Sequence, residues 1–471
     1  MVIIRKSRWN RFRARAEAPS ATAPDKWAAA SEFRRDIGRG SVLGFACRTA
    51  FAVAWGCTVM ASAPLVAQTP SSSGLPQAGR GGRGGFTSPA PVMTEGQSIE
   101  NRAPEKADDK PLFAGQTRAP YHATPAPVVT TLTDQLRNPW SLAFLPDGKI
   151  LITEKPGTMR VVDKNNALSE PVKNMPAVAA IGQVGLLDVA LDPAFTTNRR
   201  IFFSYSAAVG EDQSQMVVAR ATFDEAANAL NDVKVVFRAM PPLLRRQSAN
   251  AGGRIAFARD GNLFVTIGDR SQSPPFDMAQ RLDNHLGKML RITVDGKPAP
   301  GNPFLNRAGA MPEIWSYGHR SEQGLAIHPT TGELWETEHG PRGGDEINTP
   351  EAGKNYGWPV IVHGIDYPGT TIGDGITEMA GMEQPLYYWD PVIAPSGLTF
   401  YTGNLFPDWK DSLFMGALRG QMLDRIALNG KRVVSEEPML VGQRVRDVRM
   451  GPDGAVYVLT DNGKLLRLTP R

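Results

Sequence analysis

Cysteine is nearly absent from this chain of 471 residues, which contains only Cys47 and Cys57. Both lie in residues 1–67, where a basic leader is followed by an apolar stretch from Thr49 to Ala67 that ends in small residues. This order is typical of a secretory signal. A mature chain without this segment would have no thiol, which excludes a disulfide scaffold, a cysteine-ligated zinc site and a cysteine nucleophile.

Net charge is also small in the main part of the chain. Residues 1–67 hold 11 of the 52 basic and 4 of the 47 acidic residues, so residues 68–471 hold 41 and 43. A nearly neutral region lacks the electrostatic attraction on which nucleic-acid binding depends, so no nucleic-acid partner is expected. Hydrophobic residues make up 41% of the sequence, which excludes a wholly disordered chain.

The segment 1–67 predicts a protein that is periplasmic or secreted. The pair Arg34 and Arg35 also permits a twin-arginine signal. An uncleaved membrane anchor is the alternative, because the apolar run nearly reaches spanning length. Lipidation at Cys57 is a further option, but bulky Trp55 two residues earlier makes a poor lipoprotein signal.

Residues 68–127 show no sustained apolar period. They run through SSSGLPQ, GRGGRGG and TSPAP before a charged stretch. This density of glycine, proline and serine predicts a disordered, flexible linker that adds nothing to a folded core. The RGG-like patch from Arg80 to Gly85 could bind RNA in another setting, but beside an export signal it indicates a linker.

From Val128 onward one pattern recurs. A turn with Asp-Gly or a similar dipeptide is followed by four to six β-forming residues and then by Thr, Asp or Glu; copies begin at Leu145, Leu191, Ala258, His328, Phe406 and Gly451. Helical periodicity is missing between most of these copies. A regular repeat of short strands is more typical of sheets arranged radially around an axis than of a β-sandwich. The sequence predicts an all-β, six-bladed β-propeller over residues 128–471. We expect Val128–Leu132 to add a strand to the last blade and close the ring.

Three dense motifs stand out in this region. They are GQVGLLDVALDP at 182–193, IWSYGHRSEQGLAIHP at 314–329 and EHGPRGGDEINTPEAGKNYGWP at 338–359. Together they resemble the PQQ-dependent soluble aldose sugar dehydrogenases of the glucose/sorbosone dehydrogenase family, over roughly 128–471. The resemblance implies a periplasmic six-bladed propeller that holds pyrroloquinoline quinone (PQQ) and calcium in its channel and oxidises aldoses.

PQQ carries several carboxylates, and the guanidinium fork of arginine binds such an anion well in a dry channel. Arg320, Arg444 and Arg446 match the family's cofactor-binding arginines. Arg419 stands where a cofactor-contacting lysine is often found, and Gln183 matches a glutamine that hydrogen-bonds near the quinone. Without the resemblance, each arginine would more often be an ion-pairing loop residue, and Gln183 could equally be a turn-stabilising amide.

Trp389, in the segment YYWDPVIAPSG, is a further candidate. It could form a wall of the sugar or quinone site. A tryptophan in the propeller core is the equal alternative.

The run Gly-Pro-Arg-Gly-Gly presents backbone carbonyls without bulky side chains, which suits a hard cation. The resemblance implies that the carbonyls of Gly340 and Pro341 bind the calcium that touches the quinone. It also implies a second calcium on the carboxylate of Glu346 and the carbonyl of Tyr356. Without the resemblance, this acidic loop would be interpreted as merely solvated.

One corner departs from the family pattern. Relatives place a histidine just before the GGR motif, as the base that removes the sugar hydroxyl proton, whereas Asn250 occupies this position in RRQSANAGGRIAF. An amide cannot accept a proton at neutral pH. Ala249 replaces a polar residue and Ser321 replaces an asparagine at the same corner. His339, beside the expected calcium loop, is the nearest candidate for a displaced base, although a structural histidine is the more frequent outcome.

Three functions remain open at this point. The leading hypothesis is a quinoprotein oxidoreductase that acts on an aldose or related alcohol and passes electrons to an external acceptor, with Gln183, Arg320 and Asn250 at the catalytic corner. The second is a catalytically impaired propeller that binds a sugar or the cofactor. The third is a calcium-dependent, lactonase-like hydrolase in which Asn250 would be a metal ligand.

Overall fold

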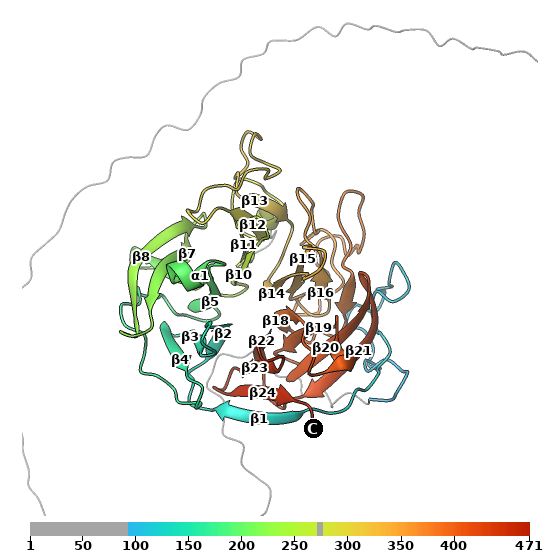
Figure 1. The fold of residues 1–471 in the computed structure, drawn as a ribbon. Coiled ribbons are helices and arrows are strands. Elements are labelled where there is room, and N and C mark those ends of the chain that lie inside the picture. Colours follow the sequence, from blue (N-terminus) through green and yellow to red (C-terminus); the bar gives the residue numbers. More distant parts are fainter. Residues whose placement is uncertain (1–92, 271–276) are drawn as a thin grey trace, which may run out of the picture. The chain divides into compact units, whose positions relative to one another are not determined.

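The computed structural model describes residues 93–270 and 277–471. Within them, six antiparallel sheets are arranged around a common axis, as Figure 1 shows. The first strands of the sheets lie nearest this axis and contact one another around the ring; they are β2 (Pro139–Phe144), β5 (Leu186–Leu191), β10 (Gly252–Phe257), β14 (Glu322–Ile327), β18 (Pro395–Phe400) and β22 (Val445–Met450). The sheets are called blades 1 to 6 in this order. The predicted all-β, six-bladed propeller is confirmed, whereas the predicted export signal in residues 1–67 lies outside the described residues.

The second strands of the blades follow directly in the chain; they are β3 (Ile150–Glu154), β6 (Arg200–Val209), β11 (Leu263–Ile267), β15 (Leu334–Glu338), β19 (Leu413–Ala417) and β23 (Val456–Thr460). Further strands extend the sheets outward; they are β4 (Thr158–Val162), β7 (Gln213–Asp224), β8 (Ala229–Arg238), β9 (Leu243–Leu244), β12 (Lys288–Ile292), β13 (Ile314–Tyr317), β16 (Asp345–Asn348), β17 (Tyr387–Trp389), β20 (Met422–Asn429), β21 (Arg432–Leu440) and β24 (Leu465–Thr469).

The six copies of the sequence pattern each contain the second strand of one blade. In four copies the turn before this strand has a glycine with positive φ, at Gly148, Gly261, Gly332 and Gly454. Glycine reaches this conformation without steric cost. The repeat in the sequence is therefore the turn between the first and second strands of a blade.

The ring is closed by β1 (Val128–Thr133), which pairs antiparallel with β24 from Val128 opposite Thr469. The last blade thus takes its outer strand from the start of the propeller, as expected. This pairing covers the hydrogen-bonding edge that β24 would otherwise expose.

Between blades, buried apolar side chains form separate clusters, and the smallest inter-blade cluster lies between blades 3 and 4. Near the axis, the buried Arg254 guanidinium lies 3.0 Å from Asp447 of blade 6 and 3.6 Å from Asp188 of blade 2. The arginine of the GGR motif therefore ties three inner strands together.

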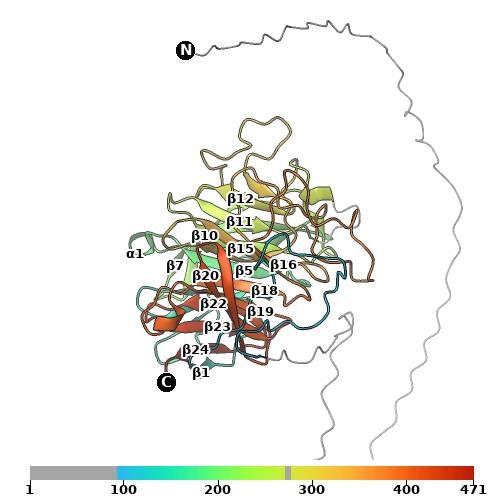
Figure 2. The ribbon, with the colours of Figure 1, turned by 90° about the vertical axis from the view of Figure 1, so that its right-hand side faces the viewer.

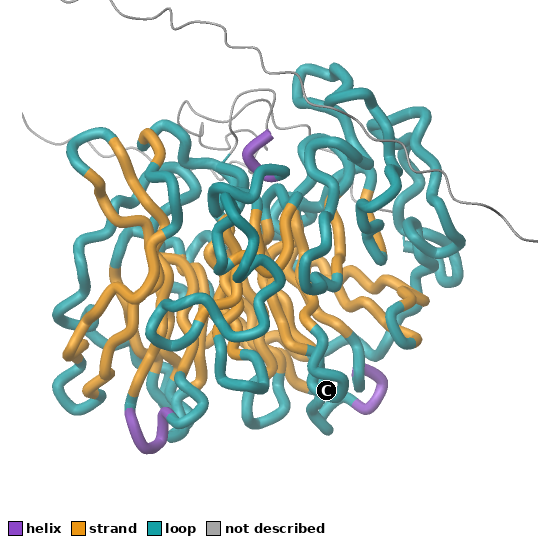
Figure 3. Tube along the Cα trace, turned by 90° about the horizontal axis from the view of Figure 1, so that it is seen from above, coloured by secondary structure: helices purple, strands orange, loops and turns teal. Residues whose placement is uncertain are grey.

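Helical turns are few in residues 93–270 and 277–471; they are α1 (Phe195–Asn198), η1 (Asp277–Ala279) and η2 (Pro407–Trp409). Figure 3 shows strands in the body of the propeller and loops at its two rims. In this part of the chain, no helix combines the length and apolarity needed to cross a membrane.

Residues 93–127 pack along the outside of the propeller beside β21, as Figures 1 and 2 show. Ala119 is buried in the apolar cluster of blades 4 and 5, and its N–H donates to the Tyr387 hydroxyl over 2.8 Å. Gln116 is fully buried and bonds to the Pro385 carbonyl. The prediction of a linker that adds nothing to the core is therefore wrong for residues 93–127. This segment has no apolar period, but single buried side chains such as Ala119 and Gln116 hold it against the propeller. Residues 68–92 lie outside the described residues.

Candidate functional site

Most of the predicted site residues gather at one rim of the propeller. Gln183, Asn250, Arg320 and Arg444 each come just before the first strand of a blade, whereas His339 follows a second strand directly. Because first and second strands are antiparallel, the start of one and the end of the other meet at the same rim. The structure thus brings together loops from separate blades.

A chain of hydrogen bonds forms the base corner. The Gln183 side-chain carbonyl accepts from the Asn250 backbone N–H over 2.8 Å. The buried Asn250 amide donates through Nδ2 to Asp269 Oδ1 over 2.8 Å. The other oxygen of Asp269 accepts from the Trp358 indole over 2.8 Å. Gln183 and Asn250 are therefore neighbours, and Asp269 joins Asn250 to an aromatic ring.

Backbone geometry fixes the position of Asn250. The residue has a φ of 46°, in the left-handed region that asparagine tolerates. The Asn250 carbonyl oxygen lies close to Gly268. A Cβ added to Gly268 would be only 2.1 Å from this oxygen. A glycine at position 268 is thus required for this close approach.

His339, the candidate for a displaced base, is held by the backbone of blade 5. Its partly buried ring bonds through Nε2 to the Pro395 carbonyl over 2.7 Å. Burial lowers the pKa of His339 to about 3, with further lowering by Arg320, Arg446 and Arg444, although the Pro395 hydrogen bond acts in the opposite direction. The imidazole therefore has a structural role. The Ser321 hydroxyl is likewise engaged, because it accepts from Gln323 over 3.3 Å.

Arg320 lies next to the expected calcium loop. Its Nη1 donates to the carbonyls of His339 and Gly340, each over 2.8 Å, and its guanidinium lies 5.1 Å from the centre of the Trp358 ring. Its buried Nε has no hydrogen-bond partner among the described residues. An unused donor of this kind can bind an anionic group.

Further cations surround this point. Arg444 and Arg446 both pair with Asp461, with nitrogen–oxygen distances of 2.8 Å for each Nε. Lys155 donates to the Gly182 carbonyl over 2.8 Å, directly beside Gln183. Burial and then the proximity of Arg446 and Arg444 lower the pKa of Lys155, although Asp461 opposes this. Around Asp461, three cationic side chains thus surround one carboxylate, and this local arrangement favours an anionic ligand.

A cavity of about 20 Å³ opens beside Arg320. All of the predicted calcium ligands line it; they are Gly340, Pro341, Glu346 and Tyr356. Glu338 lines it as well, and the Glu346 carboxylate accepts from Asn348 over 3.0 Å. Asp345 holds the loop by accepting from the Gly340 N–H over 2.9 Å. Carbonyl and carboxylate oxygens around a cavity of this size fit a hard cation such as calcium.

Of the two remaining predicted residues, Trp389 lies apart from this group, whereas Arg419 comes two residues after the end of the second strand β19 and so lies at the same rim. Trp389 is buried in the core of blades 4 and 5, where its indole donates to Glu436 over 2.8 Å. It is therefore a core tryptophan and forms no wall of the site. Arg419 follows β19, and its backbone N–H donates to Ile393; in the described ranges, no hydrogen bond or ion pair links its side chain to the other site residues.

Sequence reasoning missed Asp269, Trp358 and Lys155. Trp358 belongs to the GKNYGWP motif, and Asp269 and Lys155 each lie within two residues of the end of a second strand. Second strands end at the same rim as the site. A polar residue just after a predicted second strand was therefore the sequence feature that could have revealed Asp269 and Lys155.

Comparison with known proteins agrees with this arrangement. The family model described as glucose/sorbosone dehydrogenase matches residues 136–467. Aldose sugar dehydrogenase YliI of Escherichia coli K12 is 44% identical over 356 residues, which cover 74% of this chain and 95% of that protein.

Solved structures give the same result. The soluble aldose sugar dehydrogenase of Escherichia coli in its apo form aligns with a TM-score of 0.69 and 42% identity, over 74% of this chain and 100% of that chain. The PQQ-bound aldose sugar dehydrogenase of Streptomyces coelicolor aligns with a TM-score of 0.59 and 30% identity, over 74% and 99% of the two chains. The chain belongs to the glucose/sorbosone dehydrogenase family.

Proposed function

We propose that this protein is a periplasmic or secreted quinoprotein oxidoreductase, which oxidises an aldose or a related alcohol with PQQ held beside calcium at the propeller rim. The similarity to two aldose sugar dehydrogenases, one of them PQQ-bound, supports this proposal. The observation that carries it is the buried, unpartnered Nε of Arg320 next to the cavity lined by Gly340 and Glu346.

The cationic residues of the rim suit a ligand with several carboxylates. Arg444 and Arg446 share one acidic partner, Asp461, so two guanidinium groups face a single carboxylate. Lys155 adds a third charge. Charge-assisted hydrogen bonds from such groups are about twice as strong as neutral ones. These residues would bind PQQ, while oxygen ligands of the adjacent loop would hold calcium.

When bound, PQQ supplies the acceptor for the hydride that leaves the sugar. The chain's own residues bind and orient the substrate: Gln183 and Asn250 offer polar groups, and Trp358 offers an aromatic surface. The hydroxyl proton requires a separate acceptor, which the Asn250 amide cannot provide. We therefore expect slow turnover of simple aldoses, with the electrons passing to an external acceptor.

A catalytically impaired binder is the second candidate, and the amide at position 250 is the observation that favours it. A lactonase-like hydrolase, in which the Asn250 side-chain carbonyl would bind a metal, is less well supported, because the similar proteins named above are aldose sugar dehydrogenases.

Reconstitution with PQQ and calcium, followed by dye reduction with a panel of sugars and alcohols, tests these functions. Quinone absorbance on the protein together with sugar-dependent dye reduction is the expected result. Quinone binding without turnover on any substrate would favour the impaired binder. A protein that binds no quinone in the presence of calcium would contradict both.

A further inference from the structure

A second acidic cluster lies deeper, on the face of blade 4 that is turned toward blade 3. Glu338 of β15 is directly opposite Glu322 of β14 and Glu346 of β16, and Glu336 is opposite Asn348. Residues paired in this way point to the same face of a sheet. The face therefore carries four carboxylates, although like charges in directly opposed positions are destabilising.

The described residues provide little compensation for this charge. The backbone N–H of Arg320 donates to Glu338 over 2.6 Å, but in the described ranges no lysine or arginine side chain forms an ion pair with any of these four carboxylates. Lys288 of β12 is fully buried nearby, but its ammonium donates to the backbone carbonyls of Met278, Ala279 and Leu286. Burial lowers the pKa of Lys288 to about 7, so at neutral pH it supplies only part of a charge.

Glu336 is, with Glu322, one of the two least satisfied members of the cluster. Its side chain is fully buried, and neither carboxylate oxygen has a hydrogen-bond partner in the described part of the chain. Asn348 uses its amide nitrogen on Glu338 and Glu346. Burial, followed by repulsion from Glu338 and Glu322, raises the pKa of Glu336 well above its ordinary value. A buried carboxylate without a partner is costly unless a proton or a cation neutralises it.

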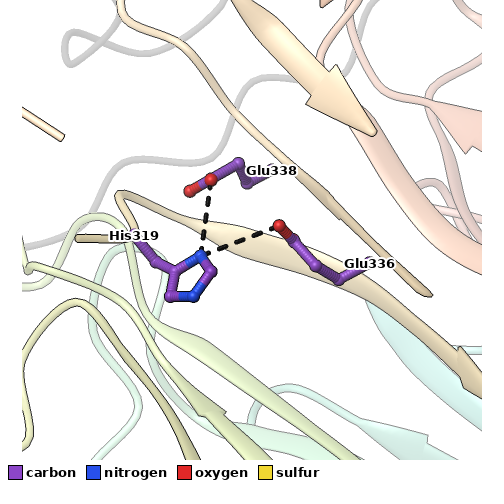
Figure 4. Close-up of side chains that lie close together, drawn as sticks. All are labelled: His319, Glu336 and Glu338. Carbon is purple, nitrogen blue, oxygen red and sulfur yellow. Dashed lines mark ion pairs between the residues drawn. The ribbon is translucent and has the colours of Figure 1, made fainter. Parts of the chain in front are cut away.

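An imidazole completes the cluster. His319 Nδ1 lies 3.5 Å from Glu338 and 3.7 Å from Glu336, as the dashed lines in Figure 4 mark. This nitrogen, Nδ1, has no hydrogen-bond partner among the described residues. The Ser316 hydroxyl contacts the other ring nitrogen over 2.8 Å, which keeps Nδ1 turned toward the carboxylates.

These separations suit three ligands of one ion. The ligand atoms of His319, Glu336 and Glu338 all lie within 4.8 Å of one another. Two ligands held about 2.1 Å from a tetrahedral ion are separated by about 3.4 Å, close to the observed distances and longer than a hydrogen bond. All three side chains are buried, so an ion here would be enclosed by the protein.

We propose that His319, Glu336 and Glu338 bind a first-row divalent metal ion between blades 3 and 4, with zinc as the best-suited ion. An imidazole nitrogen with two carboxylates is a donor set for zinc, whereas calcium sites use oxygen ligands. The three-ligand group does not include Glu346 or Tyr356, the residues proposed for calcium, although Glu338 lines the same cavity as these two residues. Since His319 directly precedes Arg320, the ion would also fix the turn that carries this arginine.

Zinc titration of the chelator-treated full-length protein tests the proposal, with calcium in excess throughout to fill the oxygen sites. We expect one zinc per wild-type chain, measured by calorimetry and by elemental analysis after gel filtration. Glu336→Gln should weaken zinc binding at least about tenfold, because it replaces an ionised ligand by a neutral amide of similar size. Ser316→Ala should weaken it about tenfold to a hundredfold, through loss of ring orientation.

Glu322→Gln is the matched control. This glutamate is equally buried, its oxygens also lack partners among the described residues, and it lies on the same face but outside the three-ligand group. We expect the zinc affinity of the Glu322→Gln variant to remain within about threefold of wild type. Zinc should raise the melting temperature of this variant as it does for wild type. At the same zinc concentration, zinc should raise the melting temperature of Glu336→Gln less than that of wild type.

Three results would overturn the proposal. Wild-type protein that binds no zinc would show that protons alone neutralise the cluster. Equal losses of zinc affinity in Glu336→Gln and Glu322→Gln would indicate a general effect of buried charge. Loss of zinc binding only on Glu346→Gln would place the ion at the calcium position. Since zinc binding is measured without quinone, none of these results depends on the proposed oxidoreductase function.

Discussion

The side-chain amide of Asn250 donates to Asp269 over a distance of 2.8 Å, at the corner where the sequence resemblance led us to expect a catalytic histidine. Asp269 also accepts from the Trp358 indole, so its carboxylate is held in place independently of residue 250. The group that would orient an imidazole is thus present although the imidazole is not.

This relationship predicts that Asn250→His creates the missing base. A positioned base typically contributes about 10²- to 10⁴-fold, and Asp269 would fix the new ring. We expect aldose-dependent dye reduction to rise at least about tenfold with nearly unchanged quinone affinity. Asp269→Asn in the histidine variant should cancel the gain. Wild-type protein that already turns over aldoses as fast as the histidine variant would contradict this prediction, as would loss of calcium from that variant.

Arg446→Ala should weaken quinone binding by about 1.5–3 kcal/mol, the range for a hydrogen bond to a charged group. Equilibrium titration followed by absorbance measures this change. Arg467→Ala is the control, because Arg467 pairs with Asp453 at a distance of 2.7 Å on β24 and lies outside the site. Equal affinity of the Arg446 variant and wild type would remove this arginine from the cofactor site.

Removal of calcium should release the quinone. The ligands lining the cavity are carbonyl and carboxylate oxygens, which suit calcium and hold it reversibly. A calcium-selective chelator should abolish quinone absorbance on the protein, and added calcium should restore it. Tight quinone binding in the presence of the chelator would argue against a calcium role at Gly340 and Glu346.

His339 should make the protein less stable in mild acid. Its pKa of about 3 in the folded chain lies below the ordinary value of 6.5, so the unfolded chain binds more protons between these pH values. The free energy of unfolding should therefore fall as pH decreases from 6.5 toward 3, by at most about 1.4 kcal/mol per pH unit. His339→Gln should flatten this dependence in urea denaturation. An identical slope in the variant would show that other groups cause it.

Asp390 should anchor the segment 93–127. Its carboxylate accepts from the backbone N–H groups of Glu105 and Lys106 over 2.8 and 3.1 Å. Asp390→Ala should cost about 1.5–3 kcal/mol of unfolding free energy and expose this segment to protease. Glu105→Gln is the milder comparison, because its partly exposed pair with Arg342 is worth about 1 kcal/mol or less. A larger loss in Glu105→Gln would contradict this ranking.

Local sequence was sufficient for much of the fold. The turn-and-strand pattern located the second strand of every blade, because a tight turn needs particular residues wherever it occurs. It also gave the closing strand, β1. The residues Gly340, Pro341, Glu346 and Tyr356 were predicted from a motif, and the structure places all of them around one cavity.

The other features depend on contacts between segments far apart in the chain. The Trp389 indole N–H donates a hydrogen bond to Glu436, which is 47 residues away in the chain, so local sequence could not reveal this contact. Asp269 becomes part of the site through Asn250, Trp358 and Arg320, whose carbonyl accepts from the Asp269 backbone N–H over 2.8 Å. Residues 93–127 lack an apolar period, yet single side chains such as Ala119 anchor them. Periodicity cannot reveal anchors that occur singly.

The pairing of β1 with β24 also sets an order of events during synthesis. Val128 leaves the ribosome long before Thr469, its partner in the finished sheet. The five preceding blades can form while the chain grows, but the ring stays open until the final strand has been made. A chain that ends early by only the length of β24 would leave both β1 and β23 with free edges, ready to pair with another molecule.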